Sequence, residues 1–163
     1  MLLWFAGLAV PAVAAVFASR GLDYRFVLAG AVLPSLALAV DALWVMNALL
    51  FPIAVMTVVM LAGWGRRLVQ RRWLGVPIGI FGHLVLDGAW LRTEMFWWPL
   101  GNGEVAGARL RPVWLLVVME LIGAAALWWS WRRFGLADPV CRRAFLRTGR
   151  LAVAPRTRRS RRR

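Results

Sequence analysis

Long apolar runs separated by short polar stretches set the pattern of this chain. The runs cover residues 2–19, 26–40, 42–63, 74–90 and 113–131. A helix needs about 20 mostly apolar residues to cross a bilayer, so each run is a candidate span, although the second is barely long enough. We therefore predict an all-α fold, an integral membrane helical bundle of about five hydrophobic segments.

Prolines interrupt the first three runs. Pro11 predicts an irregular first span, and Pro52 predicts a kink in the third. Pro34 and Ser35 can break the second run, which is therefore either a short span or a re-entrant segment. Residues 65–73 carry four arginines and are predicted to form a loop between the third and fourth runs.

The composition strengthens the membrane interpretation. Hydrophobic residues make up 61% of the 163 residues, whereas soluble domains run nearer to about 45–50% apolar. The apolar runs leave no room for a soluble catalytic domain beside them. The single cysteine, Cys141, excludes an intrachain disulfide and a metal site built from cysteines.

The positive charge is concentrated in a few places. The net charge is +14, from 21 basic residues, all of them arginine, and 7 acidic residues. The arginines cluster at residues 66–72 and from residue 132 onward, which is the positive-inside pattern of membrane proteins. We therefore expect residues 64–73 and 132–163 in the cytoplasm, and residues 91–112 on the outer face.

The same charge pattern divides the chain into two parts. Residues 1–133 are predicted to form the transmembrane bundle, and residues 134–163 a basic cytoplasmic tail that is partly disordered. Within the tail, residues 138–147 form an amphipathic piece suited to a membrane surface. The expected partners are the lipid bilayer and, at the tail, anionic lipid headgroups. Nucleic acid is not needed to explain the charge, and no nucleic-acid motif supports it.

Polar residues inside the apolar runs gather in one half of the predicted bundle. This topology puts Asp41, Asn47 and Asp87 near the outer boundary, and His83 and Glu120 somewhat deeper in the same half. Ionisable residues are costly inside a membrane, so their presence there needs a reason. The convergence of these residues predicts a polar site that faces the outer side.

A metal centre is one interpretation of this site. His83, Asp87, Trp90 and Glu94 are spaced by four, three and four residues, which places them on one stripe if the helix continues that far. Imidazole and carboxylates are ordinary ligands of zinc and similar divalent ions, and a bound metal makes a hydroxide nucleophile from water near neutral pH. The other candidate ligands, from other helices, are Asp41, Asn47 and Glu120. Arg92 is suited to hold a phosphate or carboxylate, and Glu94 is the second candidate for substrate binding.

Each of these residues also has a structural interpretation. His83 and Asp87 can bond to each other and hold the bundle together, and Asn47 can bond between helices. Glu120 can pair with His83 or with an arginine. Asp41 and Glu94 can be solvated residues at helix ends.

The stretch GIFGHLVLDGAWLRTEMFWWPL (residues 79–100) resembles small bacterial inner-membrane proteins catalogued as membrane-bound metal-dependent hydrolases, especially actinobacterial ones. The similarity extends through LDYRFVLAGAVLP, GRRLVQRRWLGVPIG and WRRFGLADP, and covers most of residues 20–140. The resemblance implies a bacterial inner-membrane location and metal-ligand roles for His83 and Asp87. Members of the family tend to carry an aspartate after the proline of L-P-D and a histidine early in the next span. This chain has Ser35 and Asn47 at those positions.

These observations leave three hypotheses for function. The first is a multi-pass membrane protein that resembles metal-dependent hydrolases, with a working or a degenerate zinc site at the outer face and a lipid-linked or phosphorylated substrate. The second is a non-catalytic structural or partner-binding membrane protein. The third is a small transporter, although the inner-half segments look too apolar for a polar pathway.

Overall fold

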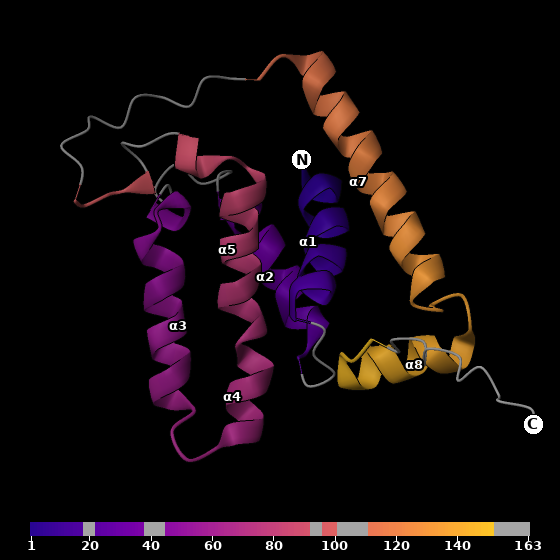
Figure 1. Cartoon of the computed structure of the whole chain (residues 1–163), viewed down its shortest axis with the longest axis horizontal. Coiled ribbons are helices and arrows are strands. Elements are labelled where there is room, and N and C mark those ends of the chain that lie inside the picture. Colours follow the sequence, from indigo (N-terminus) through magenta and orange to yellow (C-terminus); the bar gives the residue numbers. More distant parts are fainter. Residues whose placement is uncertain (18–21, 38–44, 92–95, 101–110, 152–163) are drawn as a thin grey trace, which may run out of the picture.

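The fold is a bundle of helices (Figure 1). The structure is a computed structural model that describes residues 1–17, 22–37, 45–91, 96–100 and 111–151. Within these ranges the chain forms helices and no strand. The helices are α1 (Leu2–Phe17), α2 (Tyr24–Ala37), α3 (Leu50–Ala62), α4 (Arg67–Trp73), α5 (Gly75–Leu86), the short 3₁₀ helix η2 (Ala89–Leu91), α7 (Val113–Arg133) and α8 (Pro139–Thr148).

The most extensive contact between two helices joins α2 and α5, and glycines make it possible. A Cβ atom on Gly75 would lie 2.8 Å from the Asp23 carbonyl oxygen, and one on Gly79 would lie 2.8 Å from the Ala31 nitrogen. The two helices therefore run in the same direction with their backbones in contact. Such close approach through small residues is typical of helices that pack inside membranes, where burial of apolar surface does not drive association.

A second glycine contact joins α1 to α7. Gly7 faces the backbone of Gly123, and Gly123 faces the backbone of Leu3, so a side chain on either glycine would collide with main-chain atoms of the other helix. Helix α1 thereby contacts α2 on one flank and α7 on the other. Glycine pairs, more than large side chains, set the spacing of these helices.

One helix in the described part of the chain, α7, is long and apolar enough to cross a membrane on its own. Its 21 residues span about 31 Å at 1.5 Å per residue, close to the roughly 30 Å of a bilayer's hydrocarbon core. Only 17% of its most apolar window is buried inside the protein, unlike the core helix of a soluble protein. Helices α1, α2 and α3 are apolar but shorter.

The region between the third and fourth apolar runs differs from the prediction. Residues 67–73 form the helix α4, so the predicted loop over residues 65–73 is wrong for most of its length. Helix α4 runs almost directly into α5, with only Leu74 between them. The two helices are separated there because Pro77 has no N–H to bond to the carbonyl of Trp73. The arginines of this segment therefore project from a helix that extends the α5 axis (Figure 1).

The helix of the third apolar run also begins later than predicted. Residues 45–49 form a 3₁₀ turn and bends, and regular helix starts only at Leu50. Pro52 therefore lies in the first turn of α3, where a missing N–H breaks no helical hydrogen bond, so the kink predicted at Pro52 has no cause. Pro11, by contrast, lies inside a continuous α1.

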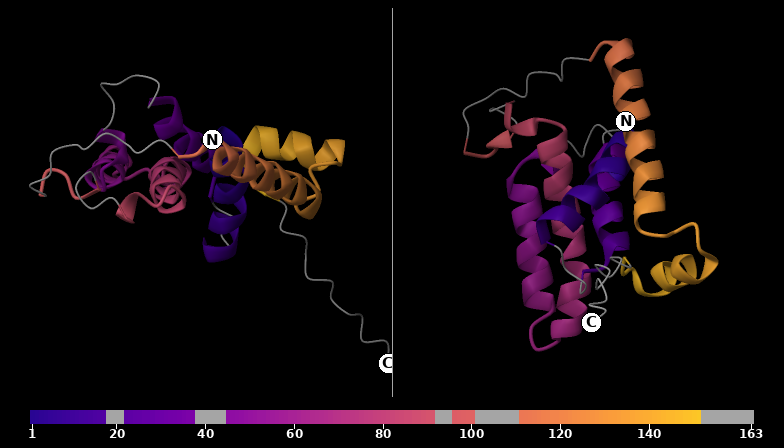
Figure 2. Two further views of the ribbon diagram at one scale, coloured as in Figure 1. Left: turned by 90° about the horizontal axis from the view of Figure 1, so that it is seen from above. Right: turned by 45° about the vertical axis from the view of Figure 1, so that its right-hand side comes forward.

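The amphipathic piece predicted at residues 138–147 is the helix α8. The Asp138 carboxylate caps it by accepting a hydrogen bond from the Val140 nitrogen at 2.8 Å. Helix α8 lies across the end of the bundle where α7 and the α3–α4 turn end, opposite the N-terminus and the start of α7 (Figures 1 and 2). The apolar cluster at this end consists of Val13, Leu22, Tyr24, Val27, Phe134 and Leu151.

Candidate functional site

His83 lies in the centre of the bundle, on the face of α5 that carries Gly75 and Gly79. Its side chain is only 1% exposed. Its Nδ1 lies 2.7 Å from the Ala31 carbonyl oxygen on α2, and its ring stacks on Phe5 of α1 with 3.7 Å between centroids. Because a carbonyl oxygen only accepts hydrogen bonds, Nδ1 carries the proton and Nε2 carries the lone pair in the neutral ring.

The parallel register of α2 and α5 brings two other candidate positions to the same level. Ser35 follows Ala31 by one helical turn, as Asp87 follows His83, so both lie toward the C-terminal ends of α2 and α5. The Ser35 hydroxyl is buried and has no hydrogen-bond partner in the described part of the chain. A carboxylate at position 35 would therefore enter the same buried region as His83.

Asp87 is held by an arginine that the sequence analysis did not single out. The Arg111 guanidinium lies 3.1 Å from Asp87 Oδ1, and the same nitrogen donates to the Asp87 backbone carbonyl at 2.5 Å. Arg111 precedes the first turn of α7, so this ion pair ties the end of α5 to the start of α7. Its sequence signal was weak, because Arg111 is one of several arginines in a long connection.

Glu120 does not join this group. Its carboxylate accepts a hydrogen bond from the Leu3 nitrogen at 2.9 Å and lies 2.7 Å from the Met1 amine. The sequence-based expectation that Glu120 pairs with His83 or an arginine is therefore wrong, because the start of α1 comes closest to this face of α7.

The predicted helical stripe is also broken. Helix α5 ends at Leu86, Asp87 is its C-cap, and Gly88 has a φ of 65°, which turns the chain out of the helix. Trp90 then lies in η2 and is 56% exposed. The spacing of four, three and four therefore does not produce one continuous face.

Asn47 is buried near the start of α3, at 5% exposure, and its amide has no hydrogen-bond partner among the residues that the structure describes. Asp41, Arg92 and Glu94 lie outside the described residues. Within the described ranges, no group of three or more His, Cys, Asp or Glu side chains is placed to hold a metal ion.

Asp23, the residue that directly precedes α2, carries a buried charge. The carboxylate is 2% exposed and accepts hydrogen bonds from the Arg25 guanidinium at 2.8 and 3.0 Å, with Arg72 at 3.6 Å. Burial acts to raise the pKa of Asp23, but the hydrogen bonds and charge of Arg25, together with Arg72, outweigh it and hold that pKa below its usual value.

The Asp23 region also holds α8 in place. The Tyr24 nitrogen donates to the Gly149 carbonyl oxygen at 2.8 Å, and Arg25 donates to the Leu146 carbonyl oxygen at 2.6 Å. Gly149 has a φ of 66°, and a Cβ there would collide with the Asp23 carboxylate. These contacts join α2 to the C-terminal end of α8, where free helical carbonyls can accept them.

Comparison of the chain with family models, with curated proteins and with solved structures found no match.

Proposed function

We propose that this is a multi-pass protein of the bacterial inner membrane, related in pattern to the metal-dependent hydrolases it resembles. In this proposal its outer-half polar residues join helices and no longer form a working metal centre. The observation that carries the proposal is that three candidate ligands each contact a different element. His83 bonds to Ala31 on α2, Asp87 pairs with Arg111 just before α7, and Glu120 pairs with the start of α1.

Several observations support insertion of the whole bundle. Its helices cross through glycines, and large apolar side chains are exposed on α3, α5 and α7. The arginine-rich α4 and α8 lie at the same end of the bundle (Figure 1), as expected for a cytoplasmic end. Helices shorter than a full span, such as α2, are tolerated where their ends are buried in protein.

The structural interpretation also accounts for the chemistry of His83. A buried imidazole is costly unless it is hydrogen-bonded, and the Ala31 carbonyl satisfies its Nδ1–H. Stacking on Phe5 links a third helix to the same ring. One side chain thereby joins α1, α2 and α5 at their centre.

A working zinc site remains the second candidate, and one observation favours it. Metal-binding histidines commonly donate one ring N–H to a backbone carbonyl and ligate through the other nitrogen, which is the tautomer that Ala31 imposes here. Such a site needs ligands besides His83, and Asp41, Glu94 and Glu104 are the remaining carboxylates on the predicted outer side. The reaction would be metal-assisted hydrolysis of a lipid-linked or phosphorylated substrate at the outer face.

Metal analysis of the full chain, purified without chelator, distinguishes the structural role of His83 from a working zinc site. Asparagine keeps an N–H donor near the position of Nδ1 and removes Nε2, whereas alanine removes both. We expect no stoichiometric zinc in the wild type, a loss of about 1–3 kcal/mol for His83→Ala, and a smaller loss for His83→Asn, which keeps the bond to Ala31 but removes the stack on Phe5. Stoichiometric zinc that both variants lose would overturn the structural role and establish the metal centre.

Two further measurements test the rest of the proposal. A reporter fused after Arg163 should read cytoplasmic, and a periplasmic signal would reverse the orientation. The double variant Ser35→Asp, Asn47→His restores the residue types implied by the resemblance. It should gain zinc binding if the site is a remnant, and failure to gain any would remove the support for that origin.

A further inference from the structure

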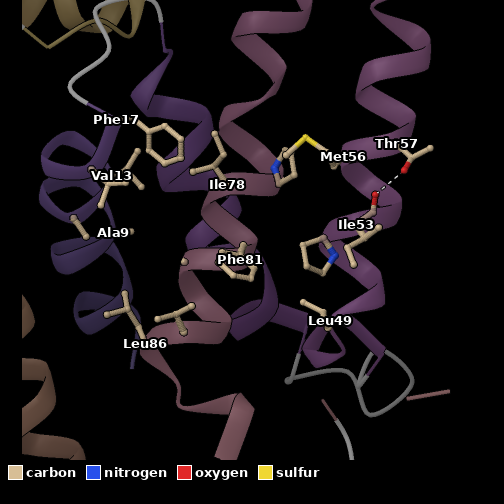
Figure 3. A pocket seen from close by; sticks show the side chains of 16 residues that line it. Ala9, Val13, Phe17, Leu49, Ile53, Met56, Thr57, Ile78, Phe81 and Leu86 are labelled. Atoms are coloured by element: carbon tan, nitrogen blue, oxygen red, sulfur yellow. Dashed lines mark hydrogen bonds between the residues drawn. The ribbon is translucent and has the colours of Figure 1, made fainter. Parts of the chain in front are cut away.

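A large apolar groove runs along the side of the bundle between α1, α3 and α5. It forms where α1 and α3 each pack against α5, so that the exposed side of α5 is the floor of the groove and α1 and α3 are its two walls (Figures 1 and 3). Its volume is about 690 Å³, within the range of pockets that hold small molecules, roughly 300–1,000 Å³. Residues that line it include Val13, Phe17, Ile53, Met56, Ile78 and Phe81.

The lining offers no polar recognition. Among the described residues of the lining, Thr57 alone carries a hydroxyl, and that hydroxyl donates to the Ile53 carbonyl oxygen at 2.9 Å (Figure 3). None of the lining residues that the structure describes is charged. A peptide or nucleotide would leave its own polar groups unpaired there, at a cost of about 1–3 kcal/mol each, whereas a hydrocarbon chain would not.

The length of the groove suits one acyl chain. On α5 the lining extends from Pro77 to Leu86, nine residue steps or about 14 Å along the helix. One leaflet of a bilayer contributes about half of the roughly 30 Å hydrocarbon core. The length of the groove therefore matches the thickness of the acyl-chain layer in one leaflet.

Positive charge lies just beyond one end of the groove. Arg67 and Arg71 are exposed on α4, which continues the axis of α5, and Arg71 is seven residue steps, or about 10 Å, from Ile78 of the lining. Unlike Arg72, which pairs with Asp23, these two arginines make no ion pair within the part of the chain that the structure describes. A phosphate attached to a chain in the groove would meet them.

We propose that this groove binds an acyl chain of one anionic phospholipid, whose phosphate is held by Arg67 and Arg71. The proposal rests on the membrane insertion proposed above, but it is independent of whether His83 binds a metal. The apolar lining selects a hydrocarbon chain, and the arginines select a negative headgroup. A second copy of this chain is the alternative occupant of the groove, and its binding would not depend on the charge of the lipid headgroup.

Gly82 offers a way to fill the groove without disturbing the fold. It lies among the lining residues, and a Cβ there would meet no atom within 4 Å. Gly82→Phe should therefore place its ring in the groove, whereas Gly82→Ala adds one methyl group and serves as the matched control. For the headgroup, Arg67→Gln with Arg71→Gln is matched by Arg142→Gln with Arg143→Gln on α8, which removes the same charge elsewhere.

The test uses the full chain in nanodiscs, with phosphatidylglycerol or phosphatidylcholine that carries a photoreactive diazirine on its acyl chain. Cross-linked peptides are mapped by mass spectrometry. Phosphatidylglycerol should label the groove faces of α3 and α5 more than the exposed face of α7, and more than phosphatidylcholine does. Gly82→Phe should reduce labelling of the groove about tenfold and leave α7 unchanged, while Gly82→Ala retains it.

The arginine pair should set the preference between the two lipids. Loss of both side chains should reduce the preference for phosphatidylglycerol by about 30-fold, which corresponds to about 1 kcal/mol for each arginine. The α8 control should keep the preference. Equal labelling of the groove and the α7 face, unchanged labelling in Gly82→Phe, or a protein–protein cross-link through the groove would each overturn the proposal. A topology reporter fused after Arg163 tests membrane insertion separately.

Discussion

Replacing Gly79 with alanine should weaken the contact between α2 and α5, whereas the same change at Gly82 should not. Both glycines lie inside α5, three residues apart, but they face different surroundings. A Cβ on Gly79 would lie 2.8 Å from the Ala31 nitrogen and 3.0 Å from the Gly30 carbonyl carbon, and closer still to the Val27 carbonyl oxygen. A Cβ on Gly82 would meet nothing within 4 Å.

The size of the expected loss of stability follows from the rigid surroundings of Gly79. The atoms facing Gly79 belong to the backbone of α2, so no side chain can rotate away, and the two helices must separate. Overpacking of this kind costs about 1–3 kcal/mol. Each glycine-to-alanine change in a helix interior also gains up to about 1 kcal/mol of helix propensity, but this gain is common to both variants. The difference between them should therefore be about 1–3 kcal/mol, with Gly79→Ala the less stable.

Reversible unfolding of both variants in detergent micelles, followed by circular dichroism, measures this difference. Separation of α2 from α5 should also lengthen the 2.7 Å contact between His83 and the Ala31 carbonyl, so the imidazole resonances should shift in Gly79→Ala and not in Gly82→Ala. Equal stabilities within about 0.5 kcal/mol would refute the backbone contact at Gly79.

Three other predictions concern the ends of the bundle. Gly149→Ala and Gly135→Ala replace glycines with nearly equal positive φ values, 66° and 67°, but only the first collides with Asp23. Amide exchange in α8 should therefore accelerate in Gly149→Ala alone, and equal acceleration in both would contradict this contact. Because the pKa of Asp23 is lowered by folding, its contribution to stability should be complete above its ordinary value of 3.8 and lost as the pH falls through the lowered value. Asp23→Asn should abolish this acid-dependent loss of α8 protection, and an unchanged pH profile would refute it. Arg111→Gln should destabilise the fold by about 1–3 kcal/mol, whereas Arg133→Gln, at an exposed position, should not, as chemical denaturation would measure.

The sequence predicted the helical class because apolar runs and arginine clusters are strong, local signals. It placed the amphipathic helix at residues 138–147 correctly, because the pattern of apolar and charged residues in this piece is a local signal. It missed α4, because four arginines in nine residues resemble a solvated loop, although arginine has a good helix propensity. Pattern alone cannot tell such a loop from a helix that extends past the apolar segment.

The candidate site was less accessible to sequence reasoning. His83 was singled out correctly as a buried polar residue, but its partner is a backbone carbonyl on α2, which has no side-chain signature. The stripe beyond Asp87 was wrong because Gly88 adopts a positive φ and ends the helix. Asp23 was overlooked because its burial depends on α8, which returns to it more than a hundred residues later.

The pairing of α2 with α5 also means that α2 is synthesised well before the helix it packs against. Helix α2 is complete at Ala37, but α5 is complete only at Leu86, 49 residues later. At about 5–20 residues per second, α2 waits roughly 2–10 seconds for the helix that covers its glycine face. Of the helices synthesised before α5, α1 makes the most extensive contact with α2, so contacts between α1 and α2 are expected to hold this short, proline-containing helix in place until α5 is made.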